Sequence, residues 1–400
     1  MAGASIFQDD RVAKVIQIGE SGLMYVIGEE EIEAVRRVFQ RKKLFRYQRD
    51  EGECDSFERE FAEKVGGRHA IILSSGTNAL IAAFRACGIK TGDEVIIPAY
   101  TFVATAAAVL NVGAIPVVAN VDEELGLDPS DVKAKITPRT RAIVPVHMDG
   151  LASNLEGLLG LCREHGLAMV EDVAQAIGGS YDGTGLGTFG DFGCFSLNEN
   201  KTISCGEGGI LITGRRDLYE RAFSFHDVSA QFNPVRKELF AEPQVVAGSS
   251  MRVSEVLGAI MRVQLQRLDG IISGLRERKK LLMAELAGIS EIRVVQGHCA
   301  EGGCGSSLHL VFQDPASALS FGREFRAAEI PFLPVIMRPA HVCWKWAPVF
   351  NAKATDYLSS LDLLSRTLKL DIDLSLTTEQ TERLGRRIAK LLHHEIPGGE

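Results

Sequence analysis

Short apolar runs rich in β-branched residues alternate with longer amphipathic segments through the first two thirds of the chain. The apolar runs are typical of buried strands and comprise residues 69–75 (HAIILSS), 94–98 (EVIIP), 115–122 (IPVVANVD), 141–148 (RAIVPVHM), 168–176 (AMVEDVAQA), 191–198 (DFGCFSLN) and 208–213 (GGILIT). The segments with helical composition between them are 76–88, 101–113 and 154–166. Strands that alternate with helices of this length predict an α/β fold with a mostly parallel sheet.

The pattern changes after Leu268. A long charged helical run, residues 270–288, is followed by a mixture of short strands and helices. The last clear helical segment, residues 377–395, has a threonine at its N-cap and cationic residues in its final turn, which suit the helix dipole. We therefore expect an N-terminal segment (residues 1–29), a large domain (residues 30–270) and a smaller C-terminal α+β domain (residues 275–400).

Residues 95–121 carry no charge, and a stretch of this length suggests a membrane span. However, Pro98 and Gly113 divide it into a strand, a helix and a second strand. A strand–helix–strand unit that is buried on both faces explains the apolar composition without lipid. We therefore expect no membrane association.

Charge and cysteine content narrow the classes of partner. The 400 residues carry a net charge of −8, whereas a nucleic-acid or anionic-membrane partner favours a basic face. A small-molecule partner is the better expectation. The eight cysteines form no C-x-x-C pair and have no zinc-ligand spacing, and the chain does not start with a secretory-signal pattern. We expect reduced thiols, no metal site and a cytoplasmic location.

Four polar clusters come directly after, or at the end of, predicted strands. They are residues 74–78 (SSGTN), 98–102 (PAYTF), 171–175 (EDVAQ) and 196–201 (SLNENK). In an open α/β sheet, ligands bind at the carboxyl ends of the strands. We therefore expect these clusters to meet in one crevice.

Lys201 is the candidate reactive group of this crevice. A solvated charge is the ordinary interpretation of a lysine, but a partly desolvated lysine loses proton affinity and becomes a Schiff-base nucleophile. Asp172 is either a structural hydrogen-bond acceptor or the partner of a protonated ring nitrogen. Residues 74–78 form either an ordinary turn or, with Ser196, an anion cradle. Together with Phe102, an aromatic residue after a strand, these groups match what pyridoxal phosphate needs.

The same motifs occur in the order found in the DegT/DnrJ/EryC1/StrS aminotransferases, and the chain resembles that family over residues 30–270. The resemblance is carried by residues 74–80 (SSGTNAL), 92–105 (GDEVIIPAYTFVAT), 113–122 (GAIPVVANVD), 136–150 (ITPRTRAIVPVHMDG), 170–183 (VEDVAQAIGGSYDG), 187–201 (GTFGDFGCFSLNENK) and 206–213 (GEGGILIT). It implies the PLP-dependent transferase fold type I, in which a mostly parallel, seven-stranded-type sheet is flanked by helices and followed by a smaller α+β domain.

The resemblance also implies a role for individual residues in holding pyridoxal 5'-phosphate (PLP). It assigns the Schiff base to Lys201 and the partner of the pyridinium nitrogen to Asp172. The other implied contacts are the ring hydroxyl for Gln175, the phosphate for Gly76, Thr77 and Ser196, and the ring face for Phe102.

Family members usually act as homodimers in which each subunit completes its neighbour's site. Residues 247–269 resemble the segment that reaches across, and this segment contains Ser250 and Arg252. Ser250 stands where an asparagine near the neighbour's cofactor phosphate is common, so we count it among the cofactor residues with a shorter side chain. Arg252 is a candidate substrate residue.

Two further departures from the family pattern concern the substrate pocket. Residues 45–53 (FRYQRDEGE) replace a TTGP-like turn, which makes Arg46 and Tyr47 candidate substrate residues. Arg46 either pairs with a substrate carboxylate or is a structural or solvated arginine. Asp149 stands where a tyrosine is frequent. The stretch at 45–53 is similar to the branch that aminates unusual sugars, including an eight-carbon sugar acid.

The resemblance implies an aminotransferase that moves an amino group from L-glutamate or L-glutamine to a keto- or aldehydo-sugar or a sugar-like intermediate. Amino-sugar, surface-polysaccharide or natural-product biosynthesis would be its setting. One alternative is a sugar dehydratase that uses PLP or its amine form PMP, although such relatives carry a histidine in place of Lys201. The other alternative is a non-catalytic regulatory relative.

Overall fold

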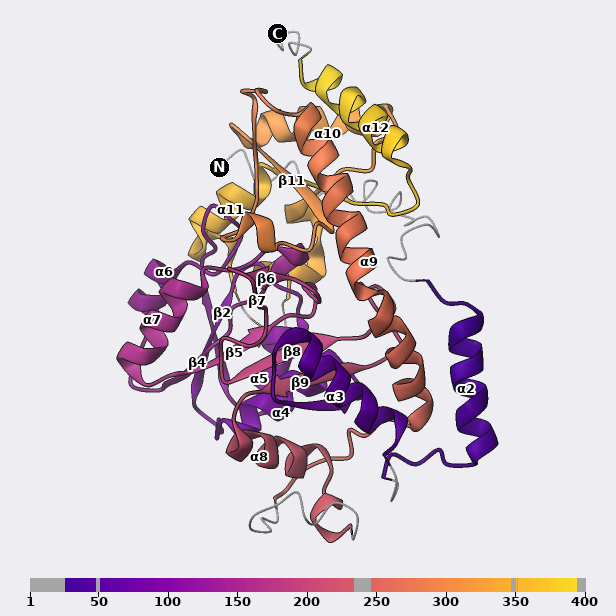
Figure 1. The fold of residues 1–400 in the computed structure, drawn as a ribbon. Helices are drawn as coiled ribbons and strands as arrows, with labels where there is room; N and C mark the ends of the chain where they lie inside the picture. Colours follow the sequence, from indigo (N-terminus) through magenta and orange to yellow (C-terminus); the bar gives the residue numbers. More distant parts are fainter. Residues whose placement is uncertain (1–25, 48–50, 234–245, 347–349, 351, 394–400) are drawn as a thin grey trace.

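A seven-stranded sheet with strand order β1-β9-β8-β5-β4-β2-β3 forms the centre of the computed structural model, which describes residues 26–47, 51–233, 246–346, 350 and 352–393 (Figure 1). The strands are β1 (His69–Leu73), β2 (Glu94–Pro98), β3 (Ile115–Ala119), β4 (Thr140–Ile143), β5 (Ala168–Asp172), β8 (Phe192–Ser196) and β9 (Gly209–Thr213). β9 runs antiparallel to both of its neighbours, β1 and β8, and the other pairs of adjacent strands in this sheet are parallel. The predicted α/β fold with a mostly parallel sheet is confirmed.

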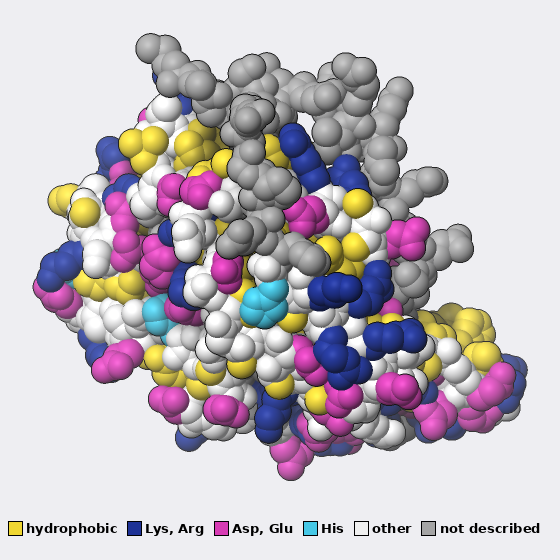
Figure 2. Space-filling view, turned by 90° about the horizontal axis from the view of Figure 1, so that it is seen from above, with side chains coloured by type: hydrophobic (Ala, Val, Ile, Leu, Met, Phe, Trp, Pro, Cys, Tyr) yellow, Lys and Arg dark blue, Asp and Glu magenta, His cyan; other side chains and the backbone are white. Residues whose placement is uncertain are grey.

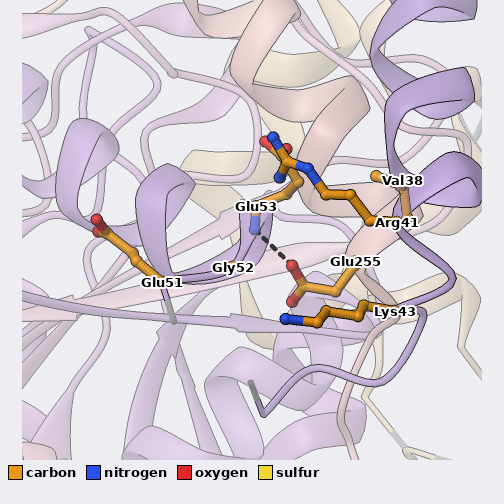
Figure 3. Close-up of a pocket in the computed structure, with 7 residues that line it drawn as sticks. All are labelled: Val38, Arg41, Lys43, Glu51, Gly52, Glu53 and Glu255. Carbon is orange, nitrogen blue, oxygen red and sulfur yellow. Dashed lines mark hydrogen bonds and ion pairs between the residues drawn. The ribbon is translucent and has the colours of Figure 1, made fainter. Parts of the chain in front are cut away.

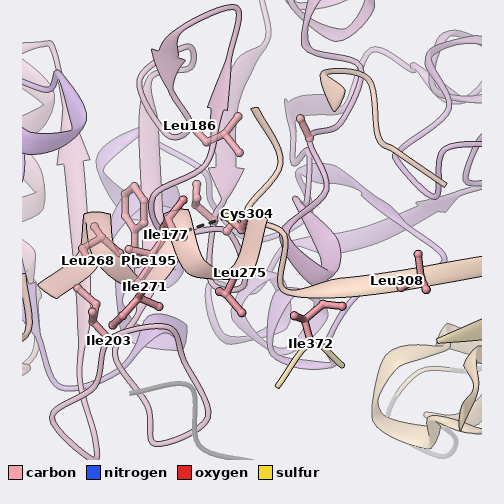
Figure 4. Packing of buried hydrophobic residues seen from close by; sticks show 14 of the residues in the cluster. Ile177, Leu186, Phe195, Ile203, Leu268, Ile271, Leu275, Cys304, Leu308 and Ile372 are labelled. Carbon is pink, nitrogen blue, oxygen red and sulfur yellow. Dashed lines mark hydrogen bonds between the residues drawn. The ribbon is translucent and has the colours of Figure 1, made fainter. Parts of the chain in front are cut away.

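Both faces of this sheet are covered, because its strands are apolar on both sides. Ile71 and Leu73 of β1 enter one hydrophobic core, whereas Ile72 between them enters the other. Figure 4 draws part of the second of these cores, where Phe195 of β8 belongs to the same cluster as Leu268. The helices along this part of the chain are α3 (Glu53–Val65), α4 (Gly76–Ala86), α5 (Ala104–Asn111), α6 (Pro129–Lys135), α7 (Leu155–His165) and α8 (Arg216–His226).

A 31-residue helix, α9 (Glu255–Glu285), connects the large sheet to a second sheet with strand order β10-β11-β13-β12 (Figure 1). The elements of this part are β10 (Ile292–Val294), β11 (Ser307–Phe312), α10 (Pro315–Ala327), β12 (Leu333–Pro334), α11 (Leu358–Ser365), β13 (Thr367–Asp371) and α12 (Thr378–Leu392). The Thr377 side chain caps α12 as predicted, since its hydroxyl accepts from the Gln380 N–H at 3.2 Å. Because α9 runs straight through residues 270–275, the domain boundaries stay a prediction.

Helix α2 (Glu29–Arg41) packs on α9 at the edge of the molecule (Figure 1). On the face seen from above, acidic and basic side chains are interspersed (Figure 2). The uncharged residues 95–121 form β2, α5 and β3 as predicted, and no helix in the described part of the chain has the length and apolarity to cross a bilayer. The described residues also contain no group of three His, Cys, Asp or Glu side chains that suits a metal ion.

Candidate functional site

The fold brings the four predicted polar clusters to one edge of the large sheet. Strands β2, β5 and β8 are parallel, and β1 has the same direction because β9 is reversed between β1 and β8. Their carboxyl ends therefore meet at the same edge, as expected for a ligand site in such a sheet.

Lys201 lies in the loop that follows β8. Its backbone N–H donates to the Asn198 carbonyl oxygen at 3.0 Å. Burial lowers the pKa of the Lys201 amine, and the nearby carboxylates of Asp172 and Asp149 only partly oppose this shift. Its amino group makes no hydrogen bond or ion pair with any residue that the structure describes. Lys201 is therefore a sheltered amine that is free to react.

Asp172 ends β5 and is buried. Its carboxylate accepts hydrogen bonds from the Thr105 hydroxyl at 2.8 Å and from the Ala174 N–H at 3.1 Å. Burial raises the pKa of Asp172, and these two hydrogen bonds together with the charge of Lys201 oppose the shift. The carboxylate is thus held in one orientation and lacks a full cationic partner, which suits a protonated nitrogen of a ligand.

Glu171 precedes Asp172 but has a structural role. Its carboxylate accepts from the N–H groups of Gly187, Phe189 and Gly190 at 2.8–2.9 Å, and lies 3.3 Å from the buried His147 ring. Successive residues of a strand point to opposite faces, so only one of the two carboxylates can face Lys201. The coupling between the charges of Lys201 and Asp172 identifies Asp172 as that one.

The first turn of α4 has the form of an anion cradle. Ser75 caps the helix by accepting from the Asn78 N–H at 3.1 Å, whereas the N–H groups of Gly76 and Thr77 have no partner among the described residues. A Cβ atom on Gly76 would lie 2.9 Å from the Cβ atom of Ser196, so only glycine allows this approach. Two open amides, a hydroxyl and the helix N-terminus together fit a phosphate group.

Gln175 and Phe102 border the same region. The Gln175 side-chain oxygen accepts from the Asp149 N–H at 3.0 Å. The Phe102 side chain is 44% exposed, and its ring centroid lies 5.3 Å from that of His341. An exposed aromatic ring at the end of β2 is available to stack on a flat ligand, which is the contact predicted for Phe102.

The structure places Arg46 in a buried ion pair with Glu58, one of the two alternatives considered for it. Glu58 also accepts from the Ile72 N–H at 2.6 Å, so the pair ties the segment before α3 to β1. The ring of Tyr47 packs 6.2 Å from that of Phe223 and 5.8 Å from the Arg46 guanidinium. A role of Arg46 and Tyr47 in substrate binding stays a prediction.

Ser250 and Arg252 adjoin the α4 cradle. Asp227 pairs with Ser250 in a β-bridge and with the Arg252 guanidinium in an ion pair. The Met251 carbonyl between them accepts from the Ser74 N–H at 3.0 Å. Ser250 is exposed, and a quarter of the Arg252 side chain is exposed. Both side chains therefore lie at the surface next to the predicted phosphate site.

A buried cluster surrounds Asp149, at the position where a tyrosine is frequent in the family. The sequence did not predict this cluster. The Asp149 carboxylate accepts from the Tyr100 hydroxyl at 2.6 Å and from Arg338 and Lys369 at 3.0 Å each. The cations Arg338 and Lys369 keep the pKa of Asp149 well below its usual range. Arg338 also bonds the His341 ring at 3.1 Å, which joins the cluster to Phe102.

A separate cavity of about 160 Å³ lies where α2 and the beginnings of α3 and α9 meet (Figure 3). Its wall contains both acidic and basic side chains, and Glu255 accepts from the Glu53 N–H there. None of the residues predicted for the site lines it. The sheet-edge group around Lys201 is therefore the better candidate for chemistry.

The model of the DegT/DnrJ/EryC1/StrS aminotransferase family matches residues 26–389, and the chain belongs to this family. GDP-perosamine synthase of Vibrio cholerae is 38% identical over 236 residues, which cover 59% of this chain and 63% of that protein. L-glutamine:2-deoxy-scyllo-inosose aminotransferase of Micromonospora echinospora is 40% identical over 225 residues, which cover 54% of this chain and 53% of that protein. The matched region thus spans less than two thirds of either relative.

Solved structures of related proteins agree over almost the whole chain. The S. venezuelae protein DesV, solved in complex with a ketimine intermediate, is 28% identical with a TM-score of 0.79. The alignment covers 92% of this chain and 95% of DesV. The fold is therefore that of PLP-dependent aminotransferases of fold type I.

Proposed function

We propose that the chain is a PLP-dependent aminotransferase that moves an amino group from L-glutamate or L-glutamine to a keto- or aldehydo-sugar or a sugar-like acceptor. The observation that carries the proposal is the sheltered amine of Lys201, electrostatically coupled to the buried carboxylate of Asp172. Family membership and the names of the relatives, one of which takes L-glutamine, support the same reaction class.

The residues of the site fit the cofactor at each point. Gly76, Thr77 and Ser196 would hold its phosphate, since their donors are open and close together. Asp172 would hold the proton of the pyridine nitrogen, and Phe102 would cover one face of the ring. Bound PLP supplies an electrophilic carbon and an electron sink for the substrate carbanion.

Lys201 has two tasks in this proposal. Its Nζ atom would hold the cofactor while no substrate is present, and its lowered pKa favours the neutral amine that this requires. Once the substrate amine is bound and Lys201 is released, the same Nζ atom would remove the proton from the substrate Cα. Asp172 would keep the ring nitrogen protonated, because a carboxylate within a buried site strongly favours a cationic partner.

Absorption spectroscopy tests the proposal. The purified protein with PLP should show the visible band of lysine-bound cofactor, and L-glutamate or L-glutamine should bleach it. Lys201→Ala should abolish both turnover and the band. Lys133→Ala, at a lysine whose side chain is 63% exposed, is the matched control and should behave as wild type. Wild-type turnover by Lys201→Ala would refute the mechanism.

The two alternatives give different results in the same experiment. A dehydratase would give a sugar that has lost a hydroxyl group and gained no nitrogen, whereas an aminotransferase gives an amino sugar. A regulatory relative would bind ligand, yet show no bleaching with either amino acid. Lys201 itself favours the aminotransferase over both, because neither alternative needs a reactive amine at this position.

A further inference from the structure

Arg338 is fixed between two residues of the large-domain sheet edge. Its Nη1 atom donates to the Tyr100 hydroxyl at 2.5 Å and to the Asp149 carboxylate at 3.0 Å. Its Nη2 atom lies 3.1 Å from the His341 ring nitrogen. Burial and the neighbouring Arg338 lower the pKa of His341 to about 3, so the ring is neutral and accepts this hydrogen bond.

The charges of this cluster balance only if the exposed Asp371 is counted. Asp149 is its one buried carboxylate, whereas Arg338 and Lys369 are both cationic and both contact it. Lys369 also pairs with Asp371 at 2.6 Å, but 71% of the Asp371 side chain is exposed, so water screens that charge. The two cations are therefore only partly compensated within the buried part of the cluster, and both are near enough to Lys201 to lower the pKa of its amine.

Arg338 also has hydrogen-bond donors to spare. A guanidinium has five N–H groups, and the contacts described above use those of Nη1 and one of Nη2. The Nε–H and the second Nη2–H have no partner among the residues that the structure describes. The side chain is 18% exposed, so a ligand can reach it.

We propose that Arg338, positioned by Asp149 and Tyr100, binds a carboxylate group of a reactant at the Lys201 site. The inference rests on the proposed function, because it takes Lys201 as the reacting centre. Two open N–H donors on one planar cation, whose buried surroundings compensate its charge only in part, are what a carboxylate requires. The carboxylate belongs either to the amino-acid donor or to an acidic sugar acceptor.

Calorimetric titration of the PLP-loaded protein distinguishes the two sources. Glutarate represents the donor without its amine, and D-glucuronate represents an aldehydo-sugar acid. Their uncharged counterparts, glutaramide and D-glucose, are the ligand controls. Arg338→Gln should weaken either glutarate or D-glucuronate binding about 10- to 100-fold, the loss expected for a charge-assisted hydrogen bond. The uncharged ligands should be unaffected.

Three further variants show whether a loss of binding by Arg338→Gln reflects loss of the arginine or loss of folding. Arg386→Gln removes an exposed arginine of α12 that pairs with Glu285, and should bind both acids as wild type does. Arg338→Lys keeps the charge at the same position and should retain part of the affinity. Asp149→Asn keeps Arg338 but removes its anchor, and should weaken the same acid as Arg338→Gln does.

The proposal is overturned if folded Arg338→Gln binds both acids as tightly as wild type, or if the wild type binds neither. It is also overturned if the uncharged ligands lose as much affinity as the acids. These outcomes are separate from failure of the aminotransferase proposal, because glutarate and D-glucuronate bind without any turnover. Absence of bleaching by amino donors together with Arg338-dependent acid binding would refute the reaction alone.

Discussion

The folded protein favours the neutral forms of Lys201 and Asp172 more than water does. Burial lowers the pKa of the lysine and raises that of the carboxylate, although each group favours the charged form of the other. The two side chains form no direct ion pair with each other. The pocket therefore holds two groups at a cost in stability, a cost that a ligand with complementary charge would offset.

Asp172→Asn is expected to stabilise the cofactor-free protein at neutral pH. It should also lower turnover about 100-fold or more, which is the usual loss when a site loses one electrostatic contact to developing charge. The folded pKa of Asp172 lies above its unfolded value of 3.8, so the ionised carboxylate disfavours folding once the pH exceeds that value. Asparagine keeps the shape of the side chain and carries no charge.

Calorimetric unfolding at two pH values checks this prediction. The stabilising effect of Asp172→Asn should be present at pH 7 and should vanish as the pH falls below 3.8, where the carboxyl of the wild type is protonated in both states. Asp269→Asn, at a side chain that is 77% exposed, should change neither stability nor rate. A destabilised Asp172→Asn protein at pH 7 would contradict the assignment.

At the scale of elements, local patterns predicted most of the fold. The strands and the capped helix α12 follow from side-chain periodicity and cap residues, which depend on neighbours in the sequence. The ion pair between Asp149 and Arg338 joins positions 189 residues apart, and no local pattern relates them. The partner of Arg46 is similarly set by the packing of α3 on β1, which brings Glu58 to it.

The predicted site likewise has one part that follows from the sequence and another part that only the fold determines. The clusters that follow strands were identified because a sheet edge collects them, and this needed only the strand order along the chain. The resemblance alone assigned the ring-nitrogen role to Asp172. The structural role of Glu171 was not predicted, because its three N–H partners lie in residues 187–190 and no local pattern relates them to it.

Gly76→Ala tests the α4 cradle. An added Cβ atom would lie 2.9 Å from the Cβ atom of Ser196, so α4 or β8 must shift, with a loss of about 1–3 kcal/mol in the free energy of unfolding. The shift separates the open amides of α4 from the Ser196 hydroxyl, and the affinity for PLP should fall. Fluorescence titration of the cofactor-free protein with PLP measures this affinity.

Gly160→Ala is the control for this experiment. Gly160 lies within α7, and an added Cβ atom there would meet nothing within 4 Å. Alanine should raise stability by up to about 1 kcal/mol through its helix propensity, with no effect on PLP affinity. Unchanged PLP affinity in Gly76→Ala would show that the first turn of α4 does not hold the phosphate.

At the scale of the whole molecule, the site residues form two groups that meet at α4. One group surrounds Lys201 and Asp172, and the other, with Arg252 and Ser250, surrounds Asp227. The second group presents Ser250 and part of Arg252 at the surface beside the cradle. A surface position next to a cofactor site is where a second copy of the chain would complete that site, so we propose a homodimer with shared sites.

Mixing two inactive variants tests the shared sites. Lys201→Ala removes the amine from its own subunit, whereas Arg252→Ala removes a group that we expect to act on the neighbouring subunit. When equal amounts are unfolded and refolded together, about half of the dimers combine one of each, and each of these has one complete site. Activity should therefore return to about a quarter of wild type. Refolding either variant alone is the control and should give none. If each site were built from one chain, the mixture would be no more active than the average of its two components, and the shared-site homodimer would be wrong.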